Sequence, residues 1–419
     1  MTDQRVQPRR VGRRVLIIDE NEQVPRDRRV WLECLALSAA GYQVTVICPM
    51  FEGDPPVEHL DGITLYRYPP SPPASDVIGF VYEYAYSWVR TLLLTFKVMR
   101  REGFDVLQAC NPPDTYFAIA WLYKLFGKPF VYDHHDLAPE TYQARFDHPS
   151  RALLWGLRLL ERLTFGTADR VIATNDSYRE VALTRGGKSA QDVVVVRSGP
   201  DPEQMRLRSP RPELRNGRRH LCCYVGIMGP QDGVDLAVRA AHILVHEMGR
   251  RDCSFALLGS GDSYDEVRAL VHELGLDDYI VMPGFVLDDE LVAYLSTADV
   301  GLCPEPLNAL NDVSTMVKTM EYMAFELPVV AFDLKETRFS AGDAAVYVTP
   351  NKVEEFAAAV AGLLDDPERR AAMGRVGRRR VEEVFAWPLQ ARTYVEVFDQ
   401  LIGGAADPSA GKPRRRLIH

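Results

Sequence analysis

The sequence predicts an α/β protein with two doubly wound domains, and three observations lead there. Short apolar, β-branched runs recur along the whole chain, and helix-length segments with a 3.6-residue apolar period separate most of them. One stretch, residues 199–220, interrupts this alternation with prolines, arginines and other polar residues. Alternating strands and helices imply parallel sheets covered on both faces. The interruption implies two domains of similar size that meet across a cleft.

The strands can be placed in order on either side of that interruption. Residues 1–199 are expected to form an N-terminal Rossmann-like domain with strands "VLIID", "QVTVIC", "VLQAC", "FVYD", "RVIAT" and "VVVVR". Residues 200–384 are expected to form a C-terminal Rossmann-like domain with "LCCYVGIM", "FALLGSG", "IVMPGFV", "DVGLCP", "LPVVAF" and "AAVYV". The amphipathic helix 385–402 is a candidate for packing back on the first domain, and residues 403–419 are typical of a mobile tail. Because ligands of open α/β sheets lie at the carboxyl ends of the strands, both domains should offer loops to one cleft.

Composition excludes several classes of protein. The chain has 419 residues, 47% of them hydrophobic, and a formal net charge of −9. An acidic chain of this kind lacks the basic face of a dedicated nucleic-acid binder, so no nucleic-acid partner is expected. Its seven cysteines form no C-x-x-C motif and no zinc-type cluster, so we expect reduced cysteines and no bound metal. The N-terminal apolar run is too short for a signal peptide, which favours a cytoplasmic protein.

One segment, "NDVSTMVKTMEYMAFELPVV" at residues 311–330, combines helix-capping residues with a lysine and a glutamate one turn apart. The short side chains predicted to cap the start of this helix are Asn311, Asp312, Ser314 and Thr315. A helical period puts Met316, Met320, Met323 and Leu327 on the core face and Lys318, Glu321, Tyr322 and Phe325 on the other. Lys318 near a helix N-terminus could bind a phosphate, and Glu321 could hold two sugar hydroxyls. The alternative is an ion pair between Lys318 and Glu321 on a solvated face, worth about 0.2–0.5 kcal/mol.

The glycine pattern argues against a nicotinamide-dependent dehydrogenase. Such an enzyme needs G-x-G-x-x-G directly after a strand, because only glycine lets the backbone approach the pyrophosphate closely. The first strand runs into "DENEQVPRDRRV", which has no glycine. "GSGDSY" supplies Gly259 and Gly261 but has Tyr264 where the third glycine belongs. A phosphate-binding P-loop is also missing from the sequence.

Several stretches, taken in chain order, resemble one enzyme family. They are the opening "RVLIIDENEQVPRDRRVWLECLALSAAGYQVTVICP", with its D-x-R-V loop, then "VYDHHDLAPE", "YVGIMGPQDGVDLAVRAA", "LLGSGD", "PGFVLDDELVAYLSTADVGLCP" and the segment at 311–330. Together they are similar to the retaining glycosyltransferases of family 4, whose two Rossmann-like domains face a cleft in the GT-B fold. The resemblance runs over residues 13–400.

The resemblance implies roles for particular residues. Glu321 matches the second glutamate of the family's E-x7-E element, which binds the ribose of a nucleotide sugar, and Lys318 on the same helical face would reach the diphosphate. His135 matches the histidine near the reacting carbon, although His134 beside it could take that place, and Asp133 and Asp136 would orient whichever ring is used. Further donor-side residues implied are Asn311, Asp312, Ser314, Thr315, Gly229, Gly259, Gly261, Phe285 and Val286. The acceptor-side residues implied are Asp27, Arg29 and Asp136.

The chemistry implied by the family is a transfer that needs no carboxylate nucleophile, metal or cofactor. The acceptor hydroxyl attacks on the face that the diphosphate leaves, and a phosphate oxygen takes its proton. The expected partners are a UDP- or GDP-sugar as substrate and a sugar or lipid-linked acceptor in glycan, polysaccharide or glycolipid synthesis.

Three positions depart from the family pattern. Val313 stands where the first glutamate belongs, and Ile227 and Asp232 stand where the family usually has arginine and lysine. Lys318 would then carry anion binding that the other loop has lost. A nucleotide-sugar epimerase or hydrolase, or a catalytically silent scaffold for another transferase, therefore stays open.

The helix expected at residues 77–101 bears on the location of the acceptor. Its polar stripe, at Glu83, Ser87, Arg90, Lys97 and Arg101, interrupts an otherwise apolar helix and is too charged for a bilayer span. The helix is either a core element or one partly exposed to a lipid surface. We expect weak, salt-sensitive peripheral contact with the inner membrane face.

Overall fold

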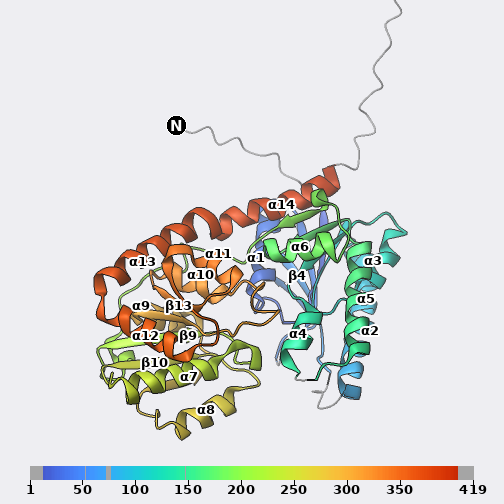
Figure 1. Ribbon diagram of the computed structural model, residues 1–419. Coiled ribbons are helices and arrows are strands. Elements are labelled where there is room, and N and C mark those ends of the chain that lie inside the picture. Colours follow the sequence, from blue (N-terminus) through green and yellow to red (C-terminus); the bar gives the residue numbers. More distant parts are fainter. Residues whose placement is uncertain (1–12, 52, 72–76, 147, 404–419) are drawn as a thin grey trace, which may run out of the picture. The chain divides into compact units, whose positions relative to one another are not determined.

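The computed structural model describes residues 13–51, 53–71, 77–146 and 148–403, which form two compact units (Figure 1). The first unit comprises Met1–Asp133, Thr164–Ile172 and Ala391–His419, and the second His134–Leu163 and Ala173–Gln390. The predicted tail at 403–419 lies outside the described residues except for Gly403.

The first sheet has eight strands in the order β3-β4-β2-β1-β5-β6-β7-β8. β1 pairs in parallel with β2 and with β5, so the order of strands reverses between β1 and β5, and β3 joins as an antiparallel edge on β4. The strands are β1 (Arg14–Ile18), β2 (Gln43–Pro49), β3 (Val57–Leu60), β4 (Ile63–Tyr68), β5 (Val106–Cys110), β6 (Phe130–His134), β7 (Arg170–Ala173) and β8 (Val193–Val195). The helices between them are α1 (Arg28–Ala39), α2 (Val77–Arg101), α3 (Phe117–Lys124), α4 (Ala138–Arg145), α5 (Arg151–Thr167) and α6 (Asp176–Thr184).

The second sheet has six strands in the order β11-β10-β9-β12-β13-β14, and all five pairings are parallel. Its order reverses between β9 and β12. The strands are β9 (His220–Val225), β10 (Cys253–Leu258), β11 (Ile280–Gly284), β12 (Val300–Cys303), β13 (Val329–Phe332) and β14 (Ala345–Val348). The remaining helices, in chain order, are α7 (Val234–His242), α8 (Tyr264–Glu273), α9 (Asp288–Thr297), α10 (Val317–Ala324), α11 (Lys335–Ala341), α12 (Val353–Asp365), α13 (Pro367–Arg380) and α14 (Trp387–Gly403).

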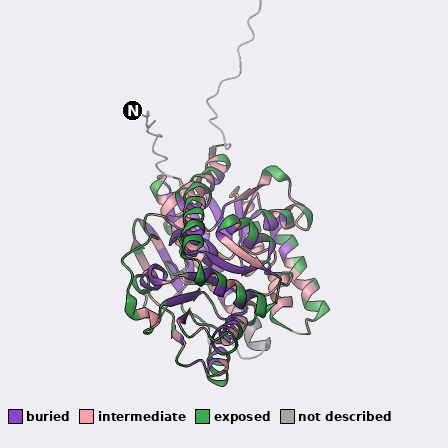
Figure 2. Cartoon of the chain, turned by 60° about the vertical axis from the view of Figure 1, so that its left-hand side comes forward, coloured by how far each residue is buried: buried purple, intermediate pink, exposed green. Residues whose placement is uncertain are grey.

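Burial explains why these strands are apolar at consecutive positions. Successive side chains of a strand point to opposite faces of the sheet. Cys222 packs with α7 and α12 in one core cluster, and its neighbour Cys223 packs with α9 and α10 in another. Helices thus cover both faces, and the strands lie buried inside (Figure 2). The prediction of two doubly wound α/β sheets is confirmed, whereas the cleft and the domain boundaries stay predictions.

The C-terminal helix α14 packs on the first sheet within the first unit. The Tyr394 hydroxyl donates a hydrogen bond of 2.7 Å to Gln108 of β5, and the Tyr42 hydroxyl donates one of 2.6 Å to Asp399. The ring of Phe398 contacts Tyr42 edge-on. Among the described residues, each helix is too short or too polar to cross a bilayer.

Candidate functional site

The reversal of strand order in the second sheet brings two glycine-containing loops together. Ligands of doubly wound sheets bind at such a reversal, beyond the carboxyl ends of the strands. Gly226 follows β9, with φ of +146°, and its backbone N–H donates to Leu258. Gly259 follows β10, and a Cβ there would lie only 1.8 Å from the Gly226 carbonyl oxygen. Both positions therefore require glycine, and the two loops form a wall in which backbone packs on backbone.

Lys318 of α10 lies against this wall and is buried. Its ammonium pairs with Glu305, two residues beyond β12, at 2.5 Å, and donates to the Tyr224 hydroxyl at 3.2 Å. A Cβ at Gly226 would lie 3.1 Å from the Lys318 nitrogen. Burial alone would lower the pKa of the Lys318 ammonium, but the Glu305 carboxylate outweighs burial and holds that pKa well above its usual value.

A second carboxylate belongs to the same place. Asp232 closes the loop after β9 by accepting a hydrogen bond of 2.9 Å from the Gly229 N–H. Burial raises the pKa of the Asp232 carboxyl against the opposing attraction of Lys318. The loop is thus surrounded by the ammonium of Lys318 and by the carboxylates of Asp232 and Glu305.

The helix that carries Lys318 begins later than predicted. Met316 is the N-cap of α10 and its side chain caps nothing, so the expectation that the polar residues at 311–315 cap this helix is wrong. They hold the preceding loop together instead. Asn311 donates to the carbonyls of Gln231 and Pro306, and Ser314 donates to that of Leu310.

The two remaining polar residues of that loop bond to other elements of the second unit. Asp312 accepts a 2.9 Å hydrogen bond from the backbone N–H of Lys335, the first residue of α11. Thr315 accepts one of 3.0 Å from the side chain of Asn175, just before α6. Asp312 thus serves the start of a different helix from the one predicted.

The division of α10 into a core face and a polar face is also wrong. Tyr322 and Phe325, predicted to lie opposite the core, are each at most 1% exposed. The Tyr322 hydroxyl reaches the end of β9, where it accepts from the Val225 N–H at 2.9 Å. α10 is therefore buried on most sides, and a lysine on it needs an internal partner.

Other predicted donor-side residues lie at the same end of the second sheet. Glu321 is half-buried on α10, one turn beyond Lys318. A Cβ at Gly261 would lie 2.7 Å from the carbonyl of Met228, so the loop after β10 also rests on the loop after β9. Phe285, 71% exposed, and the half-buried Val286 follow β11, two strands from β9. Lys318 and the two loops are in contact, and Phe285 and Val286 lie towards the sheet edge.

The predicted acceptor-side residues have different surroundings. Asp27 is the N-cap of α1 and accepts from the Val30 N–H at 2.9 Å. The Arg29 side chain is 8% exposed and forms ion pairs with Glu33 at 3.1 Å and Asp133 at 3.0 Å. Arg29 thus belongs to a charge network with two fully buried carboxylates.

The two adjacent histidines differ in exposure. His134 is fully buried, with its ring 5.2 Å from that of Tyr178. His135 and Asp136, which follow β6, are half-buried. Of the two histidines, His135 is therefore the one exposed enough to contact a substrate.

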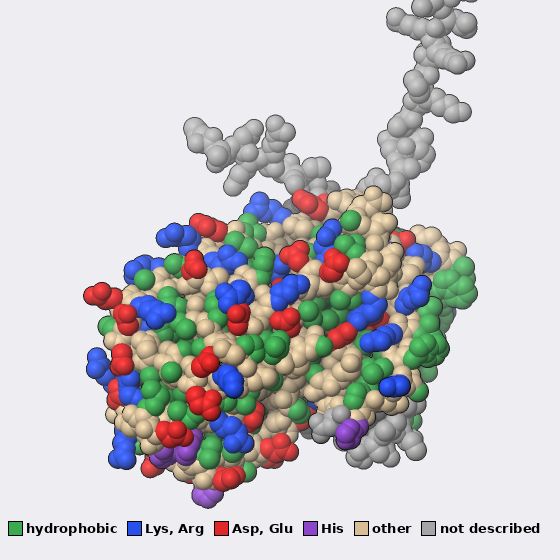
Figure 3. Space-filling model, viewed as in Figure 1, with side chains coloured by type: hydrophobic (Ala, Val, Ile, Leu, Met, Phe, Trp, Pro, Cys, Tyr) green, Lys and Arg blue, Asp and Glu red, His purple; other side chains and the backbone are tan. Residues whose placement is uncertain are grey.

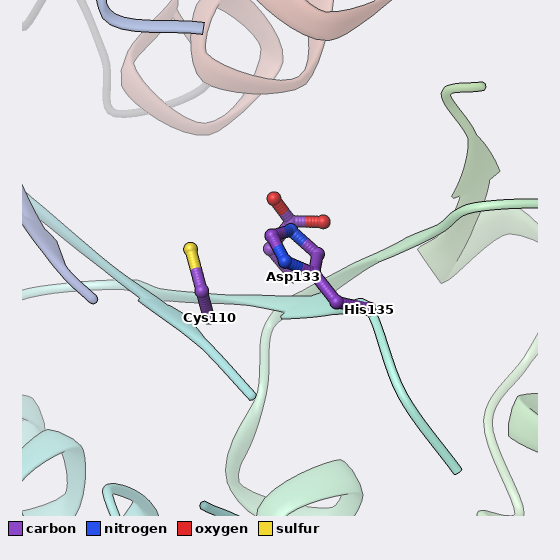
Figure 4. Close-up of side chains that lie close together, drawn as sticks. All are labelled: Cys110, Asp133 and His135. Atoms are coloured by element: carbon purple, nitrogen blue, oxygen red, sulfur yellow. The ribbon is translucent and has the colours of Figure 1, made fainter. Parts of the chain in front are cut away.

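Three side chains near the ends of β5 and β6 could in principle hold a metal ion. Cys110, Asp133 and His135 have ligand atoms within 4.8 Å of one another (Figure 4). Asp133 is already bonded to Arg29 and to Gln108, at 3.0 and 3.2 Å. Burial, together with the charge of Asp133, raises the pKa of the Cys110 thiol well above its usual value, which disfavours the thiolate that a metal requires. The surroundings therefore suit a metal poorly.

Sequence reasoning missed Glu305 and Tyr224, the partners of Lys318. The available signal was "DVGLCPEP", in which a glutamate follows an apolar strand at the ligand-binding end of the sheet. Spacing along the chain gives no indication that this glutamate meets a lysine 13 residues later.

Two protein-family models match this chain. A family model described as "Glycosyl transferases group 1" matches residues 219–366, and one described as "Glycosyl transferase 4-like domain" matches residues 27–199. The chain is 28% identical over 313 residues to a D-inositol 3-phosphate glycosyltransferase of Kineococcus radiotolerans, covering 68% of this chain and 69% of the relative. It is 26% identical to an alpha-D-kanosaminyltransferase of Streptomyces kanamyceticus, covering 73% and 81%.

Solved structures share the fold. Sucrose-phosphate synthase from Thermosynechococcus elongatus matches with a TM-score of 0.74 at 19% identity, covering 94% of this chain and all of that one. HepE of Anabaena, solved in complex with UDP and glucose, matches with a TM-score of 0.70 at 16% identity, covering 93% and 100%.

Proposed function

Since this chain belongs to the glycosyl transferases of group 1, we propose that it moves a sugar from a UDP- or GDP-sugar to a hydroxyl acceptor with retention of configuration. The observation that carries this function is the ammonium of Lys318, held against the glycine loops at the strand reversal of the second sheet. A cation held beside closely packed glycine loops can contact a phosphate of a nucleotide sugar.

Within this site Lys318 contacts the leaving diphosphate and Glu321 binds the ribose hydroxyls. The acceptor oxygen forms its bond to the anomeric carbon on the face from which the phosphate oxygen departs. The departing phosphate takes the acceptor proton. His135, half-buried beyond β6, lies on the acceptor side near the reacting carbon. These roles rest on the match of each residue to the family motifs.

The test is to measure release of UDP or GDP from a panel of nucleotide sugars, with and without candidate acceptors. A transferase gives acceptor-stimulated release. Release of UDP or GDP at the same rate with and without acceptor indicates a hydrolase or epimerase. No release from any donor indicates a silent scaffold. Activity should survive exhaustive treatment with EDTA, because the chemistry proposed here needs no metal.

A second proposal concerns the acceptor, which we place at a lipid surface. The inner face of α2 carries the buried hydroxyl residues Ser87, Thr91 and Thr95, whereas its outer face is apolar and exposed. The exposed apolar surface consists of Tyr82, Val89, Leu93 and Phe96 of α2, Trp121 of α3, and Leu125 and Phe126, which follow α3. A normal surface helix has the opposite arrangement, with its apolar face buried and its polar face exposed. Hydrophobic side chains gather along the same edge in Figure 3.

α2 and α3 present this apolar surface as one body. The Tyr123 hydroxyl of α3 donates to Thr95 of α2 at 2.9 Å, and the Tyr123 ring lies 6.3 Å from that of Phe96. The exposed cations Arg100 and Arg101 end α2 and suit anionic headgroups. One relative is named for a phosphatidylinositol mannoside acceptor, at 30% identity over 55% of this chain and 61% of its own length.

Flotation with anionic liposomes at low and high salt tests this contact. Binding at low salt that weakens at high salt is expected, because the cations and the apolar side chains act together. A protein that stays in the soluble fraction at low salt would exclude the contact.

A further inference from the structure

The donor site described above has too little positive charge for a diphosphate. Lys318 is neutralised by Glu305, and Asp232 adds a further negative charge beside the same loop. An anion with two phosphates that entered this loop would meet net repulsion, since like charges at close range disfavour binding. Another cation must compensate.

Arg145, the last residue of α4, is placed to do so. α4 follows the His135 loop directly and belongs to the second unit, where it lies against the short helical turn Pro230–Asp232. The Arg145 guanidinium pairs with Asp262, the residue after Gly261. Burial raises the pKa of the Asp232 carboxyl, and the positive charges of Lys318 and Arg145 act in the opposite direction.

The first turn of α4 is fixed, whereas its last residue is free to exchange partners. Glu140 accepts two hydrogen bonds from Arg185, at 2.5 and 3.0 Å, which anchor the first turn. At the other end, the Arg145 and Asp262 side chains are 43% and 72% exposed. An ion pair exposed to this degree contributes little to stability, so a stronger anion can displace Asp262 at small cost.

Resting on the proposed function, we infer that Arg145 leaves Asp262 when the nucleotide sugar binds and forms a bidentate contact with its diphosphate. A guanidinium suits this role because its planar fork matches phosphate oxygens. Asp262 is then a competitor that holds Arg145 near the loop and weakens donor binding.

Calorimetric titration of the full chain with UDP, GDP and ADP, and with the matching nucleosides, tests the inference. Arg145→Ala should weaken the preferred nucleoside diphosphate about tenfold or more, since a charge-assisted contact is lost, and Arg145→Lys should recover part of it. Asp262→Asn should tighten the same ligand several-fold. Nucleoside binding should not change in any variant.

A matched control is Arg239→Ala on α7. Arg239 is 53% exposed and pairs loosely with Asp235 at 3.9 Å, so its loss should leave binding unchanged. If Arg145→Ala binds like the wild type while the wild type binds a nucleoside diphosphate, the role of Arg145 is overturned and the proposed function stands. If the wild type binds none of UDP, GDP and ADP, both the proposed function and the role of Arg145 are wrong.

Discussion

The two sheets reverse their strand order in the same way, yet the ends of the strands at the two reversals differ. At β1 and β5 the nearby charges compensate each other: Arg29 lies between Glu33 and Asp133, and Gln108 donates to both carboxylates. At β9 and β12 Lys318 is also paired, with Glu305, but it lies beside two glycine loops that pack backbone against backbone.

Charged residues alone therefore do not mark an anion site. Each reversal has a cation paired with carboxylate groups, Arg29 with Glu33 and Asp133, and Lys318 with Glu305. The loop after β1 has no glycine, whereas the loops after β9 and β10 carry glycines whose backbones are in contact. We expect the reversal at β9 and β12 to bind phosphate. We expect the stability of the reversal at β1 and β5 to depend more strongly on protonation.

The largest effect should come from breaking the buried pair at the second reversal. Lys318→Met leaves the Glu305 carboxylate buried without its cation, which should cost about 3–5 kcal/mol of unfolding free energy. The double variant Lys318→Met/Glu305→Gln should regain most of that stability. Neither variant should bind UDP or GDP as the wild type does, because a phosphate contact of about 1.5–3 kcal/mol is gone.

Denaturant unfolding and calorimetric titration separate these two contributions. A double variant that is stable and binds nucleoside diphosphates normally would show that Lys318 is purely structural. That result would remove the main contrast between the two reversals.

The second-largest effect should be a pH dependence of protein stability that arises beside the first reversal. Glu20, two residues beyond β1, accepts a hydrogen bond from the Tyr116 hydroxyl, and burial raises its pKa from 4.5 to about 7. The folded state therefore holds a proton that the unfolded chain releases near pH 4.5. The associated stability is fully present below pH 4.5 and is lost as pH rises through 7.

Urea unfolding at pH 5 and pH 8 checks this dependence with Glu20→Gln, which stays neutral throughout. From pH 5 to pH 8, the free energy of unfolding of the wild type should fall by up to about 3 kcal/mol more than that of Glu20→Gln. The exposed Glu273→Gln is a control that should follow the wild type. Equal losses in wild type and Glu20→Gln would contradict the assignment.

A smaller effect is expected on the outer face of α2 in the first unit. Leu93 and Phe96 are 57% and 45% exposed, so Leu93→Gln/Phe96→Gln should leave the melting temperature nearly unchanged. Liposome binding should fall by about 1–3 kcal/mol, because two apolar side chains no longer leave water. Val98→Ala, on the buried face, should lower the melting temperature and leave flotation intact. If Leu93→Gln/Phe96→Gln floats like the wild type and Val98→Ala does not, the outer face of α2 is not the membrane-binding surface.

The smallest effect should come from Asp312 in the second unit. Asp312→Asn keeps an oxygen that can accept from the Lys335 N–H, so the melting temperature should not change. Asp312→Ala should cost about 1 kcal/mol, as for the loss of a helix cap. Turnover is the second measurement, since loss of activity in a normally stable Asp312→Asn would indicate that the carboxylate also touches the donor sugar.

The sequence predicted the layers of this fold because runs such as "LCCYV" are apolar at every position, which only a sheet covered on both faces requires. It failed at the start of α10 because Asn311 and Ser314 bond to their own loop, and capping propensity does not distinguish these uses.

The candidate site was predicted in part. Lys318 and the glycine loops had local signals, whereas the partner of Lys318 lies across a loop and could not be found from helical spacing. On α2, the predicted polar stripe combined Ser87 with four charged residues. The hydroxyl residues Ser87, Thr91 and Thr95, four apart, were the better signal for the buried face.

Backbone contact between the loops of Gly226 and Gly259 has a thermodynamic consequence. A wall made of peptide groups has no side-chain rotamers to freeze when a ligand arrives, so its ordering entropy is already lost on folding. Donor binding to this wall should therefore show a small entropic penalty. Selectivity among donors would then follow from the shape of the sugar and base.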